Sequence, residues 1–219
     1  NSPLTLSELK KLEEFSSKLI YLLSPLYISH KMVCNNHKDL NSFIYEQESA
    51  SSDLNALDSY EKPYDCLITL NQRILNLLTS MSLFLVKSEN LLKEVYGKKS
   101  QELTQWNKER NLMHSESVAY QFSYMLRNYA QHKALPLDNI SVDYCRGGDK
   151  QVININLHKA TMLTSGYKWT KAELLTLSKL PNTINLIPIL NEYIKISIKL
   201  FAHICKIAES ELNAFDFFI

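Results

Sequence analysis

The feature that most constrains this chain is a long repeat of apolar residues spaced alternately three and four positions apart. Its members are Leu67, Leu70, Ile74, Leu77, Met81, Phe84, Leu91 and Val95, with Ser88 in register among them. This spacing keeps side chains on one face of an α-helix. We therefore expect a helix from Tyr64 or Asp65 to Tyr96, about 45–50 Å long and ended by Gly97. A coiled-coil seam is less favoured because apolar residues spread beyond a narrow stripe.

A second repeat of the same kind predicts another long helix over residues 183–213. Its members are Ile187, Leu190, Ile194, Ile198, Phe201, Cys205, Ala208 and Leu212. Pro188 fits such a helix if it lies in the first turn. The apolar tail FDFFI follows, and it either covers the core or docks on a partner. Two long apolar faces predict a helical bundle.

Three further helices are expected from their caps and breakers. Thr5 or Ser7 caps a first helix that Pro25 interrupts after about Leu23. Residues 46–63 are acidic and rich in serine, which predicts a surface connection. A polar helix covers residues 101–114, and its charged residues Lys108, Glu109 and Arg110 are expected on a solvated face. Thr170 caps a short helix that runs to about Leu180, before Pro181.

Between residues 139 and 157 the apolar period changes from that of a helix to that of a strand. Ile140, Val142 and Tyr144 alternate with polar residues, as do Ile153, Ile155 and Leu157, and Arg146-Gly147-Gly148-Asp149 lies between the two runs. The pattern predicts a β-hairpin. A lone hairpin is marginal in water, so we expect it to pack on the helices. Residues 158–168 could add a third strand.

Composition excludes several classes of protein. Four glycines in 219 residues, with no Walker A sequence and no G-x-G-x-x-G, exclude P-loop and Rossmann proteins. A net charge of +1 provides no broad positive field for nucleic acid, although it permits a local phosphate site. Four widely spaced cysteines and no apolar run of membrane-spanning length favour a cytoplasmic protein. The chain does not begin with Met, which suggests a piece of a longer protein.

One group of residues is compatible with a metal site. His30, Cys34 and His37 are spaced by four and three, so a helix would place them on one side, and zinc accepts both residue types. The stronger interpretation is structural, because no fourth ligand is evident and Asn35-Asn36 suggests a helix end. We expect no metal and no cofactor.

The richest polar cluster lies in the stretch Ser115–Pro136, which predicts one amphipathic helix stopped by a proline. Its apolar members Val118, Phe122, Met125 and Tyr129 follow the helical period. A polar set runs beside them: Ser117, Gln121, Tyr124, Asn128 and His132. Asn128 and His132 share a face, and the long side chain of Arg127 can reach it. A guanidinium, a carboxamide and an imidazole together suit a phosphate.

At Arg127-Asn128-x-x-x-His132 the sequence resembles the R-x(4–6)-H signature of HEPN domains. The resemblance covers about twenty residues, RNYAQHKALP being its centre. It implies one compact, mainly α HEPN-like domain over residues 1–219, with the β-hairpin inserted at about 139–157. It also implies a metal-independent endoribonuclease, a hydrolase that binds RNA, from a toxin–antitoxin or phage-defence system. The family commonly forms a composite active site from two motifs across a homodimer.

The chemistry of these side chains is compatible with that implication. His132 can accept or donate a proton near neutral pH, Arg127 can hold two phosphate oxygens, and Asn128 can orient the imidazole or the phosphate. Weaker supporting candidates are Tyr124, Gln131, Glu116 and Glu89. His114 is more simply a surface or cap residue. The expected partners are RNA, a second copy of the chain, and an antitoxin or another defence-system protein.

Two other functions stay open on the sequence. The first is a non-catalytic binding or adaptor module, antitoxin-like, that uses the hairpin or the FDFFI tail. The second is a nucleotide-binding or nucleotidyl-modified HEPN protein, with Tyr129 as the modified residue.

Overall fold

The chain is mainly helical in the computed structural model, which describes residues 5–49, 61–137, 139–144 and 151–215. The helices of the described residues are α1 (Leu6–Ser49), α2 (Glu61–Tyr96), α3 (Gln101–Glu116), α4 (Val118–His132), α5 (Lys159–Thr164), α6 (Lys171–Ser178) and α7 (Leu186–Phe215). The strands are β1 (Ser141–Tyr144), β2 (Gln151–Asn154), β3 (Asn156–His158) and β4 (Thr183–Asn185). The expected mainly α fold with a β-hairpin is confirmed.

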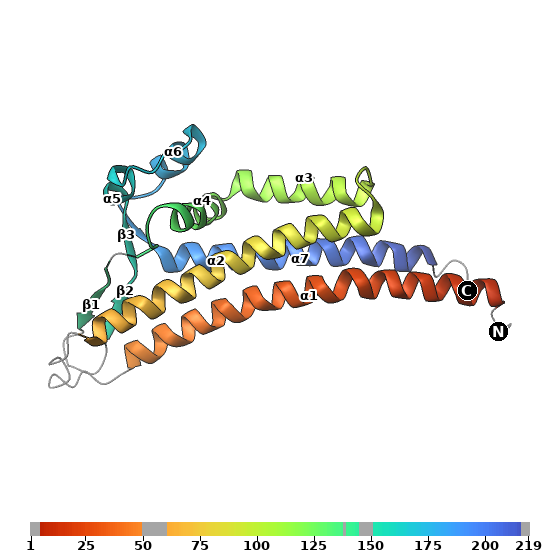
Figure 1. Cartoon of the computed structure of the whole chain (residues 1–219), viewed down its shortest axis with the longest axis horizontal. Helices are drawn as coiled ribbons and strands as arrows, with labels where there is room; N and C mark the ends of the chain where they lie inside the picture. Colours follow the sequence, from red (N-terminus) through yellow and green to blue (C-terminus); the bar gives the residue numbers. More distant parts are fainter. Residues whose placement is uncertain (1–4, 50–60, 138, 145–150, 216–219) are drawn as a thin grey trace.

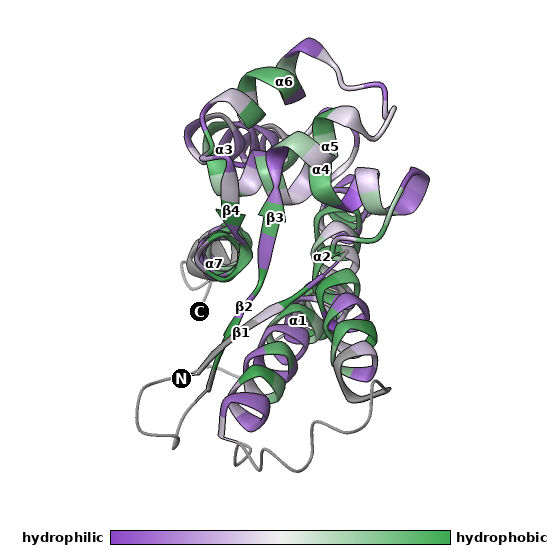
Figure 2. Ribbon diagram, turned by 90° about the vertical axis from the view of Figure 1, so that its left-hand side faces the viewer, coloured by the Kyte–Doolittle hydropathy of each residue, from purple (hydrophilic) through white to green (hydrophobic). Residues whose placement is uncertain are grey.

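The long helices are stacked in layers. Figure 1 shows α1 on one side of α2 and α7, with α3 and α4 on the other side. The two small sheets and the α5–α6 segment lie at the end of the bundle where α4 meets α2. Figure 2 looks nearly along α7, which is mainly hydrophobic, and shows both hydrophobic and hydrophilic residues along α1 and α2. Buried apolar residues are more numerous on α2 and α7 than on α1, so the middle layer is the centre of the core.

Helix α1 begins as expected and continues much further. Thr5 and Glu8 cap it reciprocally: the Thr5 amide donates to the Glu8 carboxylate at 2.7 Å, and the Glu8 amide donates to the Thr5 hydroxyl at 3.3 Å. The expected interruption at Pro25 is wrong. A proline inside a helix costs about 3 kcal/mol, but Leu22 and Leu26 on either side of it are completely buried. Each buried leucine contributes about 1.5–3 kcal/mol, so packing outweighs the lost hydrogen bond.

Helix α2 follows its apolar repeat closely. Five members of the repeat, Leu70, Ile74, Leu77, Met81 and Phe84, are at most 1% exposed. The helix starts at Glu61, slightly before the expected Tyr64 or Asp65. It ends at Gly97, whose φ of +98° suits glycine, and the Gly97 amide donates to the Lys93 carbonyl at 3.0 Å. The C-terminal end of this helix thus has a local cause.

Helix α7 is confirmed, but its buried face is rotated relative to the expected repeat. Ile198 is 50% exposed. Tyr193, Ser197, Leu200 and Ile204 are buried in its place, because α7 lies between α1 on one side and α3 and α4 on the other. The helix starts at Leu186 rather than 183, since residues 183–185 form β4. Pro188 lies in the first turn, as required.

The strands confirm the hairpin and correct its extent. β1 and β2 pair antiparallel, with Val142 opposite Ile153. Leu157, expected in the hairpin, lies in β3 and pairs with Ile184 of β4 in a second small sheet. The third strand expected at 158–168 is wrong, because α5 occupies residues 159–164 and the strand partner comes from the segment before α7. The turn Arg146–Asp149 and the final residues 216–219 lie outside the described residues.

Candidate functional site

Helix α4, which carries the Arg127–His132 motif, has a defined start. The Ser117 hydroxyl accepts a hydrogen bond from the Tyr120 amide at 3.1 Å, the usual role of an N-cap serine. The expected start at Ser115 is wrong, because α3 runs to Glu116 and Ser117 has an extended backbone. The expected apolar face is confirmed: Phe122, Met125 and Tyr129 are buried.

The end of α4 is held against α2. The helix ends at His132, and Pro136 and Leu137 beyond it are buried. The buried Asn71 amide group of α2 donates to the Leu137 carbonyl at 3.0 Å and accepts from the Leu137 amide at 2.9 Å. This pair fixes the chain directly after the motif, and therefore the position of the helix end.

Two of the three motif side chains are in contact. The Arg127 guanidinium donates through Nη1 to Asn128 Oδ1 at 3.1 Å, and both residues are partly buried. Burial raises the pKa of the Tyr193 phenol well above its ordinary value, and the charge of Arg127 opposes that rise, which places the guanidinium near α7. Within the described residues, Arg127 Nε is buried without a hydrogen-bond partner.

His132 is different from the other two. It is exposed in the last turn of α4, and among the described residues no hydrogen bond or ion pair engages its ring. The structure therefore joins Arg127 to Asn128 and leaves the imidazole accessible to solvent. Of the weaker candidates, Gln131 is exposed beside it. Glu116 is exposed at the C-terminal end of α3, before α4 begins, and does not join the motif.

The other two weak candidates, Glu89 and Tyr124, line a pocket between α2, α3 and α4. Its volume is about 430 Å³, within the usual range for small-ligand sites. The remaining lining residues are Ser82, Leu85, Val86, Arg110, Asn111, His114 and Tyr120. The ring of His114 makes edge contacts with Tyr120 and Tyr124, with centroids 5.1 and 6.3 Å away. The pocket lining thus combines aromatic, aliphatic and polar side chains.

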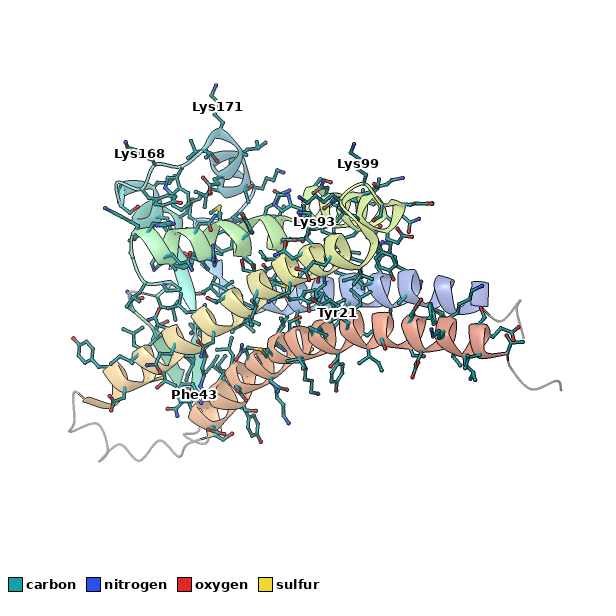
Figure 3. The ribbon with its side chains drawn as sticks, turned by 45° about the vertical axis from the view of Figure 1, so that its right-hand side comes forward. Tyr21, Phe43, Lys93, Lys99, Lys168 and Lys171 are labelled. Carbon is teal, nitrogen blue, oxygen red and sulfur yellow. The ribbon has the colours of Figure 1, made fainter. Side chains whose placement is uncertain are left out.

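An ion-pair network crosses the pocket from α2 to α3. Glu89 accepts hydrogen bonds from Lys93 and from Arg110, each at 2.5 Å, and Figure 3 shows Lys93 on α2 near α3. These bonds, to Lys93 first and then Arg110, lower the pKa of the Glu89 carboxyl. The expected solvated position of Arg110 is wrong, because its side chain is only 27% exposed and is held across the gap between the helices.

His114 is exposed, as expected of a surface residue, and its ring also lines the pocket. Burial, followed by the charge of Arg110, lowers the pKa of its ring, so His114 is neutral at pH 7. The available signal was its spacing, because Arg110 and His114 are four residues apart on α3 and so share a face. Only the packing of α3 on α2 and α4 shows that this face encloses a pocket.

Gln121 of the expected polar set is a structural residue. Its amide nitrogen donates to the His114 and Ser115 carbonyls at 2.8 and 3.1 Å, and its oxygen accepts from the Thr176 hydroxyl at 3.0 Å. It thus ties the α3–α4 turn to α6.

The histidines of α1 have protein partners. His30 is buried and stacks on Phe201 of α7, with ring centroids 4.4 Å apart, and Cys34 Sγ lies 3.9 Å from its Nε2. His37 Nε2 lies 2.7 Å from Asn191 Oδ1. The helix does not end at Asn35-Asn36. Across the described residues, no group of three or more histidine, cysteine or acidic residues is placed to hold a metal ion.

Tyr129, the residue considered for nucleotidyl modification, is only 3% exposed. Its ring stacks on Trp169 at 5.3 Å and meets Tyr167 edge-on at 5.5 Å. Such burial speaks against modification of its phenol and assigns it to the packing of α4 against the segment between α5 and α6.

Comparison with family models, with curated proteins and with solved structures finds no match for this chain. None of the helices in the described residues is long and apolar enough to cross a membrane.

Proposed function

We propose that this chain is a metal-independent endoribonuclease of the HEPN type, acting through Arg127, Asn128 and His132. The observation that carries the proposal is the arrangement at the end of α4. A permanently charged guanidinium is aligned by a neighbouring carboxamide at 3.1 Å, and an imidazole that no described residue engages in a hydrogen bond or ion pair follows in the last turn. The toxin–antitoxin or phage-defence setting rests on the resemblance alone.

The proposed reaction is an internal transesterification, in which the phosphorus exchanges its bond to the 5′-oxygen for a bond to the 2′-oxygen. A neutral imidazole takes the proton of a ribose 2′-hydroxyl, whose oxygen attacks the adjacent phosphorus as the bond to the 5′-oxygen breaks. The departing 5′-oxygen receives a proton, which leaves a 2′,3′-cyclic phosphate and a 5′-hydroxyl. Arg127 stabilises the negative charge that develops on the phosphate oxygens, and Asn128 holds the guanidinium in place.

Two proton transfers call for two titratable groups, whereas each chain presents one motif imidazole. A second copy of the chain would supply the other, so the proposed active site is composite and lies between two protomers in the cytoplasm. Exposure of His132 at a fixed helix end is compatible with such a meeting of two copies.

The test uses the purified chain and a mixture of single-stranded RNAs in excess EDTA. We expect products with cyclic-phosphate ends, and we expect Arg127→Ala and His132→Ala to abolish them. Leu135→Ala, which changes an exposed side chain near the same helix end, serves as the matched control. If both motif variants retain full biological effect and a partner protein co-purifies with them, the adaptor alternative replaces the enzyme.

A further inference from the structure

The pocket between α2, α3 and α4 is separate from the three motif residues, none of which lines it. Its lining combines aliphatic, aromatic and polar side chains. Leu85 and Val86 form an aliphatic side, Tyr124 contributes an aromatic wall that is 45% exposed, and Asn111 adds a carboxamide. Flat ligands with polar edges, such as nucleobases, match a site of this composition because they stack and accept or donate hydrogen bonds at once.

The polar groups of the pocket are available to a ligand. Within the described part of the chain, the Asn111 carboxamide, the Tyr124 hydroxyl and the His114 ring nitrogens have no hydrogen-bond partner. A neutral imidazole has one donor and one acceptor, and a carboxamide has both, which are the groups that base edges require.

Two cations lie at or beside the pocket: Arg110 belongs to its lining, and Lys93 lies outside the lining. Arg110 and Lys93 share one carboxylate, Glu89, so two cations face one anion. The hydrogen bond from Arg110 to Glu89 uses Nη1, which leaves the second terminal nitrogen, Nη2, outside the ion pair. It can donate to a phosphate oxygen while the ion pair persists.

The pocket and the motif are related by α4 itself. Tyr124 lies in the pocket, and Asn128 is one turn further along the helix. His132 is eight residues from Tyr124, which is about 12 Å along the axis. One extended RNA strand can therefore contact both regions.

We propose that this pocket binds a single nucleotide of an RNA strand, with the base against Tyr124, Asn111 and His114 and the phosphate at Arg110. The link to RNA rests on the function proposed above. The binding of a nucleotide stands on the pocket alone. The site thereby selects unpaired RNA, because a base in a duplex cannot enter it.

The first experiment measures binding of AMP, GMP, CMP and UMP to the purified chain by calorimetry, with ribose 5-phosphate as the probe that lacks a base. We expect saturable binding of at least one nucleotide and much weaker binding of ribose 5-phosphate. Tyr124→Ala should weaken nucleotide binding about tenfold, within the range for loss of one stacking contact. Tyr124→Phe keeps the ring and should restore most of the affinity.

Tyr45→Ala is the matched control, because Tyr45 is an aromatic residue of α1 that is 71% exposed and outside the pocket. Equal binding of ribose 5-phosphate and nucleotides would overturn the proposal in favour of a simple anion site. Absence of nucleotide binding, or equal weakening by Tyr45→Ala and Tyr124→Ala, would overturn it as well.

The same variants separate this inference from the proposed nuclease. His132→Ala should bind nucleotides as the unchanged chain does while losing cleavage. If the unchanged chain binds nucleotides and cleaves no RNA, the nuclease proposal fails and the nucleotide site stands. If it cleaves RNA and Tyr124→Ala leaves KM and nucleotide binding unchanged, the pocket proposal fails alone.

Discussion

The chain contains the order arginine, asparagine, histidine on two neighbouring helices, and the two arrangements differ by one residue. On α3, Arg110 and His114 are four apart, about 40° around the helix, and both line one pocket. On α4, Arg127 and His132 are five apart, about 140° around the helix. One additional residue thus converts a shared face into two separate faces, joined only through Asn128.

The surroundings of the two histidines differ in the same sense. His114 lines the pocket beside Arg110 and two tyrosine rings, whereas His132 lies at a helix end outside the pocket. The imidazole that lines the pocket is suited to holding a ligand in one orientation. The imidazole at the helix end is suited to meeting a substrate or a second copy of the chain. Substitution of each histidine in turn tests whether His114 serves binding and His132 serves proton transfer.

The largest expected effect is on cleavage by the motif. His132→Ala should lower kcat by about 10²–10⁴-fold, the usual contribution of a general acid or base. Since the side chain is exposed, thermal unfolding should be unchanged. Single-turnover cleavage measures the expected loss of rate, and a melting curve checks that thermal unfolding is unchanged. A drop in melting temperature that parallels the loss of activity would instead make His132 a structural residue.

The second prediction moves the imidazole by one position. The double variant Gln131→His with His132→Gln keeps the composition and gives α4 the four-residue spacing of α3. We expect kcat to stay at least about 10²-fold below that of the unchanged chain, because the imidazole has rotated about 100° around the helix. Recovery of cleavage would show that the five-residue spacing has no role.

The sequence predicts the long helices better than it predicts which of their faces is buried. The apolar repeats predict α2 and α7 because a long helix buries one face wherever it packs. They do not predict the rotation that exposes Ile198, since the buried face of α7 depends on α1 and α3 together. Pro25 is a local signal for a break, and burial of Leu22 and Leu26 overrides it.

The candidate site divides in the same way. The contact between Arg127 and Asn128 follows from adjacency on one helix, and the exposure of His132 follows from its place at the helix end. The pocket does not follow from any one stretch, because Glu89, Arg110 and Tyr124 come from three helices. Such a site depends on how helices pack, which local periodicity leaves open.

The third prediction concerns the pH dependence of folding stability, to which His30 and His114 contribute because their pKa values are lowered in the folded chain. Burial lowers the pKa of His30, with a smaller contribution from Lys31, and burial followed by Arg110 lowers that of His114. The unfolded chain therefore binds protons more readily than the folded one. This contribution to stability is complete above the ordinary value of 6.5 and is lost as pH falls through the folded pKa values.

Chemical denaturation between pH 7.5 and 5 measures that loss. We expect the free energy of unfolding to fall with pH, and His30→Phe, which keeps a ring against Phe201, to reduce the slope. His132→Ala, which removes an exposed imidazole, is the control. It should leave the contributions of His30 and His114 to the slope unchanged. If His30→Phe and the unchanged chain have the same slope, His30 does not contribute to the pH dependence of stability.

The smallest expected effect concerns Glu89, which joins the two helices of the pocket. Glu89→Gln removes the charge and keeps an acceptor, so unfolding should become easier by less than about 1 kcal/mol, as for partly exposed ion pairs. The contribution of Glu89 is present above its ordinary pKa of 4.5 and is lost as pH falls through the lower folded value. Its loss on substitution should therefore be measurable at pH 7 and absent in strong acid.

The same substitution should strengthen the binding of nucleotides to the pocket, because Arg110 and Lys93 no longer share a carboxylate. Glu109→Gln is the matched change of charge, because Glu109 lies on α3 and makes no hydrogen bond or ion pair among the described residues. Calorimetry with a nucleoside monophosphate compares the two variants. Tighter binding by Glu89→Gln alone would assign the gain in affinity to the pocket. Equal tightening by both variants would make the gain an effect of net charge. It would then give no support to a binding site on α3 that is distinct from a reacting site on α4.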